Sequence, residues 1–489
     1  MAETVLSLFD AGEPGAPAIK VPGGGEVTYA GVRASANAVG AALGAAGIAP
    51  GDRVALSEPD GPDFLRLLFG VLAAGATAAP LNSAYTEDEF AFYLDDLRPR
   101  ALLLPAEGLP AARAAAASTG VEVLTVEPAS APGAGTAPGP DDIALLLHTS
   151  GTTSRPKQVP LLHRNLAASA RNIAAGYGLG ADDVAYCAMP LFHVHGLVAS
   201  CLATFASGGT VVVPRRYTPR GLLADLEPFG VTWVSAGPTA YAMVLERDEK
   251  SGAAATAPRL RFLRSCSSAL PEALMAKVEA RFGVPLVEAY GMTECSHQLA
   301  TNPLPPGERK PGSVGMASGT EIRIAAPGAP TFLAQGEQGE VCVRGPGITS
   351  GYLGNPDANA SSFFDGWFRT GDLGTIDEAG YVRLEGRIKE LVIRGGENIS
   401  PYEVETALLS HPSVKEAACF GLPSEKYGEE VAAVVALDGE AGEDELLAHC
   451  RERLAAFKVP TSLTIVDAIP RTATGKLQRQ RLPAMLGLT

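Results

Sequence analysis

The first 300 residues alternate short apolar runs with longer segments whose apolar residues recur every three or four positions. Runs such as 262–265 and 286–289 are typical of buried strands, whereas the spacing over 87–97 is typical of an amphipathic helix. Regular alternation of strand and helix predicts parallel sheets built from βαβ units. The expected strands cover 54–56, 77–81, 101–104, 143–147, 184–188, 211–213, 231–235, 262–265 and 286–289, and the expected helices cover 30–46, 63–74, 87–97, 164–175, 197–206, 221–226, 240–249 and 271–283.

From about residue 312 the pattern changes to short β-type runs separated by turns, and a further unit starts near residue 388. The expected elements are strands at 321–324, 339–344 and 380–385, then a helix at 401–409, strands at 417–420 and 430–436, a helix at 444–454, a strand at 462–466 and a loop at 470–476. The chain is therefore predicted to be α/β, with a large N-terminal domain over 1–387 that includes a β-rich section near 312–387. A small α+β C-terminal domain is expected over 388–489. Residues 127–140, rich in Pro, Gly, Ala and Ser, are expected to form a linker or surface loop.

Polar loops follow several of the expected strands. The run 143–147 leads into His-Thr-Ser-Gly-Thr-Thr-Ser-Arg-Pro-Lys over 148–157. Hydroxyls, backbone N–H groups and a lysine are good donors to phosphate oxygens, although a Ser/Thr-rich surface turn has the same composition. The loop is not the Gly-x-x-x-x-Gly-Lys-Ser/Thr motif, because Lys157 follows a proline and no helix begins there. Because ligands bind at the carboxyl ends of strands in open α/β sheets, these loops are expected to meet in one site.

Composition narrows the class of protein. A length of 489 residues exceeds a single core, and 46% hydrophobic with 19% charged residues indicates a folded protein. The formal net charge of -15 argues against a nucleic-acid partner, which needs a basic face. Seven cysteines without a C-x-x-C pair argue against a disulfide framework or a zinc site. With no apolar run of the ~18–20 residues that span a bilayer and no basic signal-like start, a cytoplasmic protein without a membrane span is expected.

Five stretches, in this order, resemble the adenylate-forming superfamily of acyl-CoA synthetases, luciferases and peptide-synthetase adenylation domains. They are 148–157, 289–294, 369–372, 386–389 and 470–476, and the likeness covers nearly the whole chain. The resemblance implies a mobile C-terminal domain, with ATP, Mg²⁺ and coenzyme A as reactants. It also implies two half-reactions: a carboxylate attacks the α-phosphate of ATP to give an acyl-adenylate and pyrophosphate, and a thiol then takes the acyl group.

The same resemblance implies roles for individual residues in the ATP site. Glu294, with Thr149, would bind Mg²⁺, and Asp372 and Arg387 would bind the ribose hydroxyls, although Asp372 can also be read as a turn residue after Gly371. Tyr290 would stack on the adenine, a use compatible with core packing. The remaining residues assigned to ATP are Ser150, Gly151, Thr152, Thr153 and Lys157 at the β- and γ-phosphates, and Ser268, Ala269, Ala289, Gly291 and Thr293 around the nucleotide.

For the two half-reactions, the resemblance implies that Lys476 is the cation at the α-phosphate and the carboxylate. Lys389 would be the domain hinge, and Gly395 and Gly396 would let the backbone approach the pantetheine arm of coenzyme A. His193 would gate the meeting of acyl group and thiol, although a histidine beside an apolar stretch is often only packed. Two departures from the pattern, Gln158 and Ala289, stand where many relatives have glycine.

The stretches 190–196, 264–270, 292–297 and 302–305 look most like the oxalate–CoA ligase branch. In that branch, residues similar to Ser265, Ser267 and His297 hold oxalate, and His195 and Arg264 could add charge. A small dianion fits a short, donor-rich site better than an apolar tunnel. The alternative is that the serines cap a strand end and His297 is a loop residue.

The sequence leaves other substrates and other functions open. Malonate or another short acid is the next substrate considered, followed by a medium-chain or aromatic acid. Readings from other classes are an adenylation module that loads a carrier protein and a non-catalytic nucleotide-binding scaffold. The expected partner is a small carboxylic acid, and the expected state is a monomer or homodimer.

Overall fold

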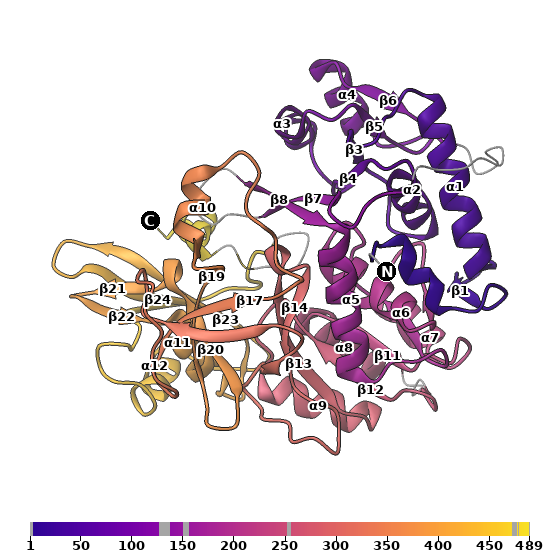
Figure 1. Cartoon of the computed structure of the whole chain (residues 1–489). Coiled ribbons are helices and arrows are strands. Elements are labelled where there is room, and N and C mark those ends of the chain that lie inside the picture. Colours follow the sequence, from indigo (N-terminus) through magenta and orange to yellow (C-terminus); the bar gives the residue numbers. More distant parts are fainter. Residues whose placement is uncertain are drawn as a thin grey trace.

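The computed structural model describes residues 3–126, 137–149, 156–251, 256–471, 477 and 479–488. Within these residues the chain forms three sheets with helices packed on them (Figure 1). The predicted α/β class is confirmed: a large N-terminal domain with two sheets precedes a smaller C-terminal domain. No helix in the described part of the chain is both long and apolar enough to cross a membrane.

The first sheet has six strands in the order β6-β5-β3-β4-β7-β8. Its strands are β3 (Arg53–Leu56), β4 (Thr77–Pro80), β5 (Ala101–Leu103), β6 (Glu122–Leu124), β7 (Ile143–Thr149) and β8 (Lys157–Leu162), and its helices are α1 (Tyr29–Ala45), α2 (Pro62–Ala73), α3 (Glu87–Leu97) and α4 (Pro110–Thr119). All neighbours are parallel, as expected, except β7 and β8, which form an antiparallel pair that the sequence did not predict. The expected loop at 127–140 lies mostly outside the described residues.

The second sheet has fourteen strands in the order β16-β17-β19-β20-β15-β14-β13-β12-β11-β9-β10-β1-β2, with β18 paired to β19. Its strands are β1 (Pro17–Lys20), β2 (Glu26–Thr28), β9 (Val184–Cys187), β10 (Thr210–Val212), β11 (Trp233–Ala236), β12 (Phe262–Ser265), β13 (Leu286–Met292), β14 (His297–Thr301), β15 (Gly315–Ala317), β16 (Glu321–Ala325), β17 (Gly339–Arg344), β18 (Phe363–Phe364), β19 (Trp367–Ile376) and β20 (Tyr381–Arg387). The strands from β1 through β13 along this path are parallel, and those from β14 onward are antiparallel. The β-rich section therefore continues the parallel sheet through β13 and β14 instead of forming a sheet of its own.

Helices connect and cover these strands. They are η1 (Leu6–Ala11), α5 (His163–Tyr177), η2 (His195–Leu202), α6 (Ala203–Ala206), α7 (Pro219–Asp225), α8 (Pro238–Ser251), α9 (Glu272–Phe282), η3 (Thr293–Cys295) and α10 (Pro356–Ser362). The single helix expected over 197–206 is instead π-helical over η2 and α-helical only in α6. Wide turns of this kind are frequent at functional sites.

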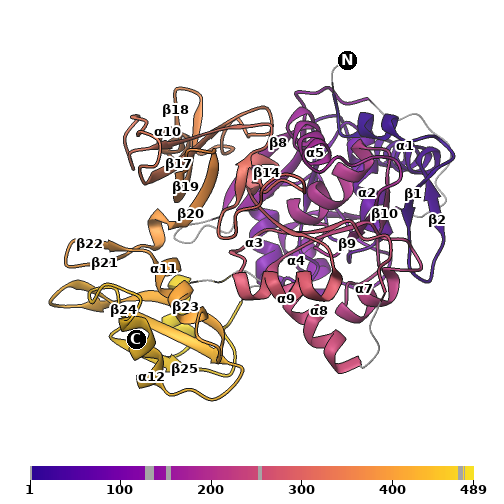
Figure 2. The same cartoon turned by 90° about the horizontal axis from the view of Figure 1, so that it is seen from below.

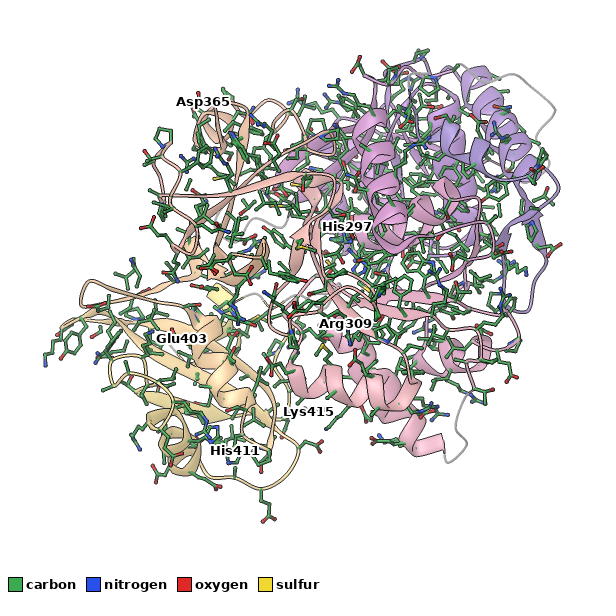
Figure 3. All side chains as sticks on the ribbon, turned by 60° about the horizontal axis from the view of Figure 1, so that its bottom comes forward. His297, Arg309, Asp365, Glu403, His411 and Lys415 are labelled. Atoms are coloured by element: carbon green, nitrogen blue, oxygen red, sulfur yellow. The ribbon has the colours of Figure 1, made fainter. Side chains whose placement is uncertain are left out.

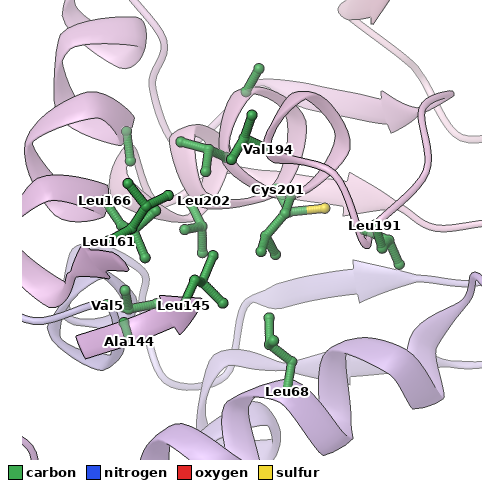
Figure 4. Close-up of a cluster of buried hydrophobic side chains, with 14 of the residues drawn as sticks. Val5, Leu68, Ala144, Leu145, Leu161, Leu166, Leu191, Val194, Cys201 and Leu202 are labelled. Carbon is green, nitrogen blue, oxygen red and sulfur yellow. The ribbon is translucent and has the colours of Figure 1, made fainter. Parts of the chain in front are cut away.

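The two N-terminal sheets share one hydrophobic core. Figure 4 shows side chains of β7, β8 and α5, among them Leu145, Leu161 and Leu166, facing Leu202 of η2. Burial of each such side chain contributes about 1.5–3 kcal/mol, so this core fixes the two sheets against each other. β7 of the first sheet and β9 of the second sheet are thereby held in fixed relative positions.

The C-terminal sheet has five strands in the order β22-β21-β24-β23, with β25 paired to β24. Its elements are η4 (Ile388–Glu390), β21 (Val392–Arg394), β22 (Glu397–Ile399), α11 (Pro401–Leu409), β23 (Val414–Ser424), β24 (Gly428–Leu437), α12 (Glu443–Arg451), β25 (Ser462–Ile465), η5 (Arg479–Arg481) and α13 (Leu482–Met485). Along β24 the side chains alternate: Val431 and Val435 face one core with α11 and α12, whereas Val434 faces another with Leu482 of α13. Seen from below, this sheet stands beside the N-terminal sheets (Figure 2).

Candidate active site

Four parallel strands end at the same edge of the large sheet. In the register of this sheet, Ser235 of β11 lies beside Cys187 of β9, Ala236 lies beside Ser265 of β12, and Ser265 lies beside Glu288 of β13. The polar loops that follow these strands therefore meet, as the sequence predicts. Non-glycine residues with positive φ also gather here, at Ser267 (φ 78°) and His297 (φ 108°). Such backbone costs roughly 1–3 kcal/mol per residue and is frequent at active sites.

Tyr290, Asp372 and Arg387 form one cluster from three strands. The Tyr290 hydroxyl donates to Asp372, and Arg387 Nε lies 3.0 Å from the other carboxylate oxygen. Asp372 and Arg387 are register partners across β19 and β20. Burial and the neighbouring Asp372 raise the pKa of Tyr290, so its hydroxyl stays a donor. Asp372 is thus a buried strand residue; the alternative that it serves only as a turn residue is wrong.

Glu294 and Lys157 approach each other around Tyr352. Glu294 lies in η3, is 6% exposed, and its Oε1 accepts a 3.0 Å hydrogen bond from the Tyr352 hydroxyl. Lys157 Nζ lies 4.3 Å from the centre of the Tyr352 ring. Burial lowers the pKa of Lys157, the nearby Lys389 lowers it further, and Glu294 opposes both. This lysine would gain from an anionic ligand, which would compensate both effects.

The loop expected to hold phosphates begins and ends on paired residues. Thr149 and Lys157 are partners in the β7–β8 register, and Ser150, Gly151, Thr152 and Thr153 lie between them, outside the described residues. Below the loop, Asp96 of α3 bridges both strands: its Oδ2 lies 2.9 Å from His148 Nε2 and 2.7 Å from Gln158 Nε2. Gln158, which departs from the family pattern, is therefore an anchor of this hairpin.

The other residues assigned to the nucleotide lie after β12, on β13 and in η3. Ser268 and Ala269 are exposed after β12, Ala289 is buried in β13, and Thr293 begins η3. At Gly291 an added Cβ would lie 1.6 Å from the carbonyl oxygen of His297, so the close approach of β13 and β14 requires glycine there.

A group that we term the strand-end polar cluster occupies the ends of β11, β12 and β14 and the start of η2; it comprises Ser235, Arg264, His195, Ser267 and His297. His195 Nδ1 lies 2.8 Å from Ser267 Oγ, and its Nε2 lies 2.8 Å from Ser235 Oγ. The His195 and His297 rings stack with their centres 4.9 Å apart. His297 lies inside the N-terminal domain and not on its rim (Figure 3). It starts strand β14, so the alternative that it is a loop residue is wrong.

Arg264 is the charged member of this cluster. It is fully buried, and it donates to Tyr177 Oη at 2.9 Å, Ser235 Oγ at 2.9 Å and Gln298 Oε1 at 3.0 Å. The next residue, Ser265, is also fully buried, and its hydroxyl has no hydrogen-bond partner among the residues that the structure describes. A buried hydroxyl in that state gains from a ligand that supplies a partner.

The residues expected to act with coenzyme A lie in two separate places. His193 Nδ1 accepts a 3.3 Å hydrogen bond from the backbone of His195, just before η2. Lys389 is exposed in η4, directly after β20. Gly395 and Gly396 form the two-residue turn between β21 and β22, with φ of 61° and 91°, and this turn explains both glycines without a ligand. Lys476 lies outside the described residues.

Sequence reasoning missed Tyr352, Asp96 and Ser235. Tyr352 carries the hydroxyl that holds Glu294, yet it lies 58 positions away and in no element that the pattern predicted. Asp96 lies on a helix that the pattern did predict, beside other acidic residues such as the exposed Asp95. Ser235 ends an expected strand, and that position at the carboxyl end was the one signal that could have identified it.

Comparisons with known proteins agree with this arrangement. A model of the AMP-binding enzyme family matches residues 9–353, and a model of the AMP-binding enzyme C-terminal domain matches residues 403–476. The oxalate–CoA ligase of Arabidopsis thaliana is 44% identical over 456 residues, which cover 89% of this chain and 88% of that protein.

Two solved structures share the whole fold. ATP-bound MatB from Rhodopseudomonas palustris is 33% identical with a TM-score of 0.91 and covers 99% of both chains. The o-succinylbenzoate–CoA synthetase MenE from Bacillus subtilis, in complex with ATP and magnesium ion, is 30% identical with a TM-score of 0.87 over 98% of this chain and 99% of that one. The chain belongs to the AMP-binding enzyme family.

Proposed function

We propose that this protein is an ATP-dependent oxalate–CoA ligase that works through an oxalyl-adenylate. The observation that supports the proposal is the strand-end polar cluster, which brings together a buried guanidinium, imidazoles and serine hydroxyls. A site for a fatty or aromatic acid would instead need an apolar wall. Oxalate carries a carboxylate at each end, so one can react while the other is held by donors. The 44% identity to the A. thaliana oxalate–CoA ligase supports the same substrate.

In the first half-reaction, one oxalate oxygen attacks the α-phosphorus of ATP, and pyrophosphate leaves with the electrons of the broken P–O bond. Negative charge grows on the phosphate oxygens, so positioned cations lower the barrier most. Lys157, with Thr149 and the loop 150–153, takes the β- and γ-phosphates, and Lys476 takes the α-phosphate and the attacking carboxylate. Asp372 and Arg387 hold the ribose, and Tyr290, with Gly291 and the backbone at 268–269, holds the adenine.

The residues present fit a magnesium ion. Mg²⁺ is usually held by one or two carboxylates together with substrate phosphates, and the described residues contain no cluster of three or more ligating side chains that would hold an ion alone. Glu294 supplies one hard oxygen ligand, and the Tyr352 hydroxyl holds it in place. Lys157 also contacts Tyr352, and Thr149 can add a hydroxyl oxygen. When bound there, the ion would offset phosphate charge.

In the second half-reaction, the thiol of coenzyme A attacks the oxalyl carbonyl carbon, AMP leaves, and the thiol proton is released. The proposed domains are 1–387 and 388–489, because the large sheet ends with β20 and the C-terminal sheet begins with β21. Rotation at Lys389 replaces the loop of Lys476 with the turn of Gly395 and Gly396, while His193 stands at the meeting of acyl group and thiol.

The compartment is proposed from the cysteines. All seven are free and buried, which fits a reducing environment such as the cytoplasm. The proposed oligomeric state is a monomer or a homodimer.

Substitutions of Ser265, and of His297 in the strand-end polar cluster, test the substrate assignment. Because the Ser265 hydroxyl has no partner among the described residues, Ser265→Ala is expected to leave the Tm unchanged and to raise KM for oxalate about tenfold, with KM for ATP unaltered. His297→Ala is expected to raise KM for oxalate at least as much. Ser200→Ala is the matched control, since Ser200 is equally buried and its hydroxyl also lacks a partner among the described residues. A rise in KM for ATP instead would refute the assignment.

A further inference from the structure

Arg264 is a fully buried cation whose hydrogen-bond acceptors are all neutral: a phenol, an alcohol and an amide oxygen. Among the described residues, no carboxylate forms an ion pair with it. An isolated buried charge costs several kcal/mol, and its removal from water is usually offset by an opposite charge. A negatively charged substrate bound near Arg264 would therefore offset the cost of burying this cation.

The guanidinium also fixes the direction of a chain of hydrogen bonds. Arginine has only donors, so Ser235 Oγ accepts from Arg264 Nη1. The single hydroxyl hydrogen of Ser235 must then go to the other group it contacts, His195 Nε2. A histidine that accepts at Nε2 carries its hydrogen on Nδ1, and Nδ1–H donates to Ser267 Oγ.

The end of this chain is the hydroxyl hydrogen of Ser267. Since Ser267 Oγ accepts from His195, its own hydrogen is left to donate, and no described residue accepts it. In the other tautomer, His195 Nε2–H would donate to Ser235 Oγ. The fully buried Ser235 hydroxyl hydrogen would then have no acceptor among the described residues, which costs about 1–3 kcal/mol. A doubly protonated His195 also leaves the Ser235 hydroxyl hydrogen without an acceptor among the described residues, because both ring nitrogens then donate.

We propose that Arg264 and Ser235 are positioning residues that act through His195 to present the Ser267 hydroxyl hydrogen to a carboxylate of the acid substrate. The inference rests on the proposed function for the identity of that acid. Arg264 sets every donor in the chain to point toward the substrate and supplies a positive potential behind them. The second carboxylate of a small dianion would accept this hydrogen bond, whereas a neutral carbonyl or an alkyl group at the same place would bind less tightly. The hydrogen-bond chain therefore selects for an acid that carries a charge at its far end.

The tautomer of His195 is the direct test. The full-length protein is labelled with ¹⁵N-histidine, long-range ¹H–¹⁵N spectra are recorded at neutral pH without substrate, and His195 is assigned by comparison with His195→Gln. The expected signature is a neutral ring protonated at Nδ1, and Ser235→Ala is expected to remove that preference. A ring protonated at Nε2, or at both nitrogens, in the unsubstituted protein would overturn the inference.

Kinetics then test the role in recognition. Ser235→Ala is expected to raise KM for oxalate roughly tenfold while KM for ATP stays within twofold, and Ser235→Thr, which keeps the hydroxyl, is expected to recover most of the loss. Ser200→Ala serves again as the buried-serine control. Equal increases in both KM values, or no recovery in Ser235→Thr, would show that Ser235 is merely structural.

The spectroscopic and the kinetic experiments together distinguish failure of this inference from failure of the proposed function. The tautomer is measured without any acid, so an Nδ1–H ring in a protein that does not turn over oxalate supports the chain and refutes the substrate. Turnover of oxalate by a protein whose His195 carries its hydrogen on Nε2 supports the substrate and refutes the chain.

Discussion

Among single residues, Glu288 shows how burial sets charge beside the active site. It is 8% exposed on β13, two positions before Tyr290, and its Oε1 accepts a 3.2 Å hydrogen bond from the Leu270 backbone. Burial raises its pKa from 4.5 to about 7, while the Leu270 N–H and Arg383 act in the opposite direction. The folded protein therefore holds this proton more tightly than the unfolded chain between pH 4.5 and 7.

A stability measurement follows from that shift. For an acid whose folded pKa is raised, stability is fully present below pH 4.5 and is lost as the pH rises through 7. Glu288→Gln removes this titration. Its free energy of unfolding is therefore expected to exceed that of the unsubstituted protein by up to about 3 kcal/mol at pH 8 and to match it at pH 4.5. Denaturant unfolding at both pH values measures this. A difference that is the same at the two pH values would contradict the account.

Single residues also show what the sequence can predict about the site. Tyr290, Glu294 and Asp372 were found from motifs, because their neighbours along the chain identify them. Their contacts were not found, since Asp372 lies 82 positions from Tyr290 and Tyr352 lies 58 positions from Glu294 along the chain. The register of the large sheet brings Asp372 and Arg387 together, whereas Tyr352 reaches Glu294 from outside any strand. Motifs name the residues of a site, and topology supplies its geometry.

Among the elements, the β7–β8 hairpin carries at its end the loop that we propose to bind the phosphates. It is tied to α3, which begins with a capping box between Thr86 and Glu89 and ends near Asp96. The Asp96 carboxylate holds His148 on one strand and Gln158 on the other, and all three are at most half-exposed. The loop between Thr149 and Lys157 is thus anchored at its base by one side chain.

Loosening that anchor is expected to weaken ATP binding. Asp96→Ala removes two hydrogen bonds that its carboxylate makes, and a hydrogen bond to a charged group is worth about 1.5–3 kcal/mol. We expect KM for ATP to rise about tenfold and KM for the acid to change less than twofold. Asp95→Ala removes the same charge from an exposed neighbouring position and is the control. Pyrophosphate release at varied ATP measures both, and equal behaviour of the two variants would refute the anchoring role.

Elements divide clearly into those that the sequence predicts and those that it misses. Most βαβ elements of the parallel sheets were predicted, because buried strands and amphipathic helices have distinct periods, whereas β1, α4 and β6 were not predicted. β8, β14 and β19 were missed: β8 contains Pro160, and β14 and β19 mix polar residues into antiparallel pairs whose partners follow other turns. The π-helical turns of η2 were missed because an apolar run gives no period that separates them from an α-helix.

At the scale of the whole molecule, the proposed site draws on both proposed domains. The N-terminal sheets supply the nucleotide and acid residues, and the proposed scheme brings Lys476 to them from the C-terminal domain in only one half-reaction. Arg479, close by in sequence, donates to Glu405 of α11 at 2.7 Å and pairs with Glu390 beside the hinge. The segment that follows Lys476 is therefore tied to the hinge region, so both are expected to move together.

The proposed domain rotation would make the two half-reactions separable. Lys476→Ala is expected to abolish pyrophosphate release from oxalate and ATP, because the cation at the α-phosphate is lost. The same variant should still form the thioester at a near-normal rate from supplied oxalyl-adenylate and coenzyme A. Each half-reaction is followed separately, with Lys458→Ala as a C-terminal lysine control. Equal loss of both half-reactions would contradict the two-conformation scheme.

The measurement that tests the central claim most directly is a competition in one reaction. The protein is incubated with ATP, Mg²⁺, coenzyme A and equal concentrations of oxalate, malonate, acetate, octanoate and 4-coumarate, and the acyl-CoA products are separated and identified by mass. A polar, charged strand-end cluster predicts that oxalyl-CoA is the dominant product. Dominance of octanoyl- or coumaroyl-CoA would contradict the account, because those acids need the apolar wall that this cluster does not provide.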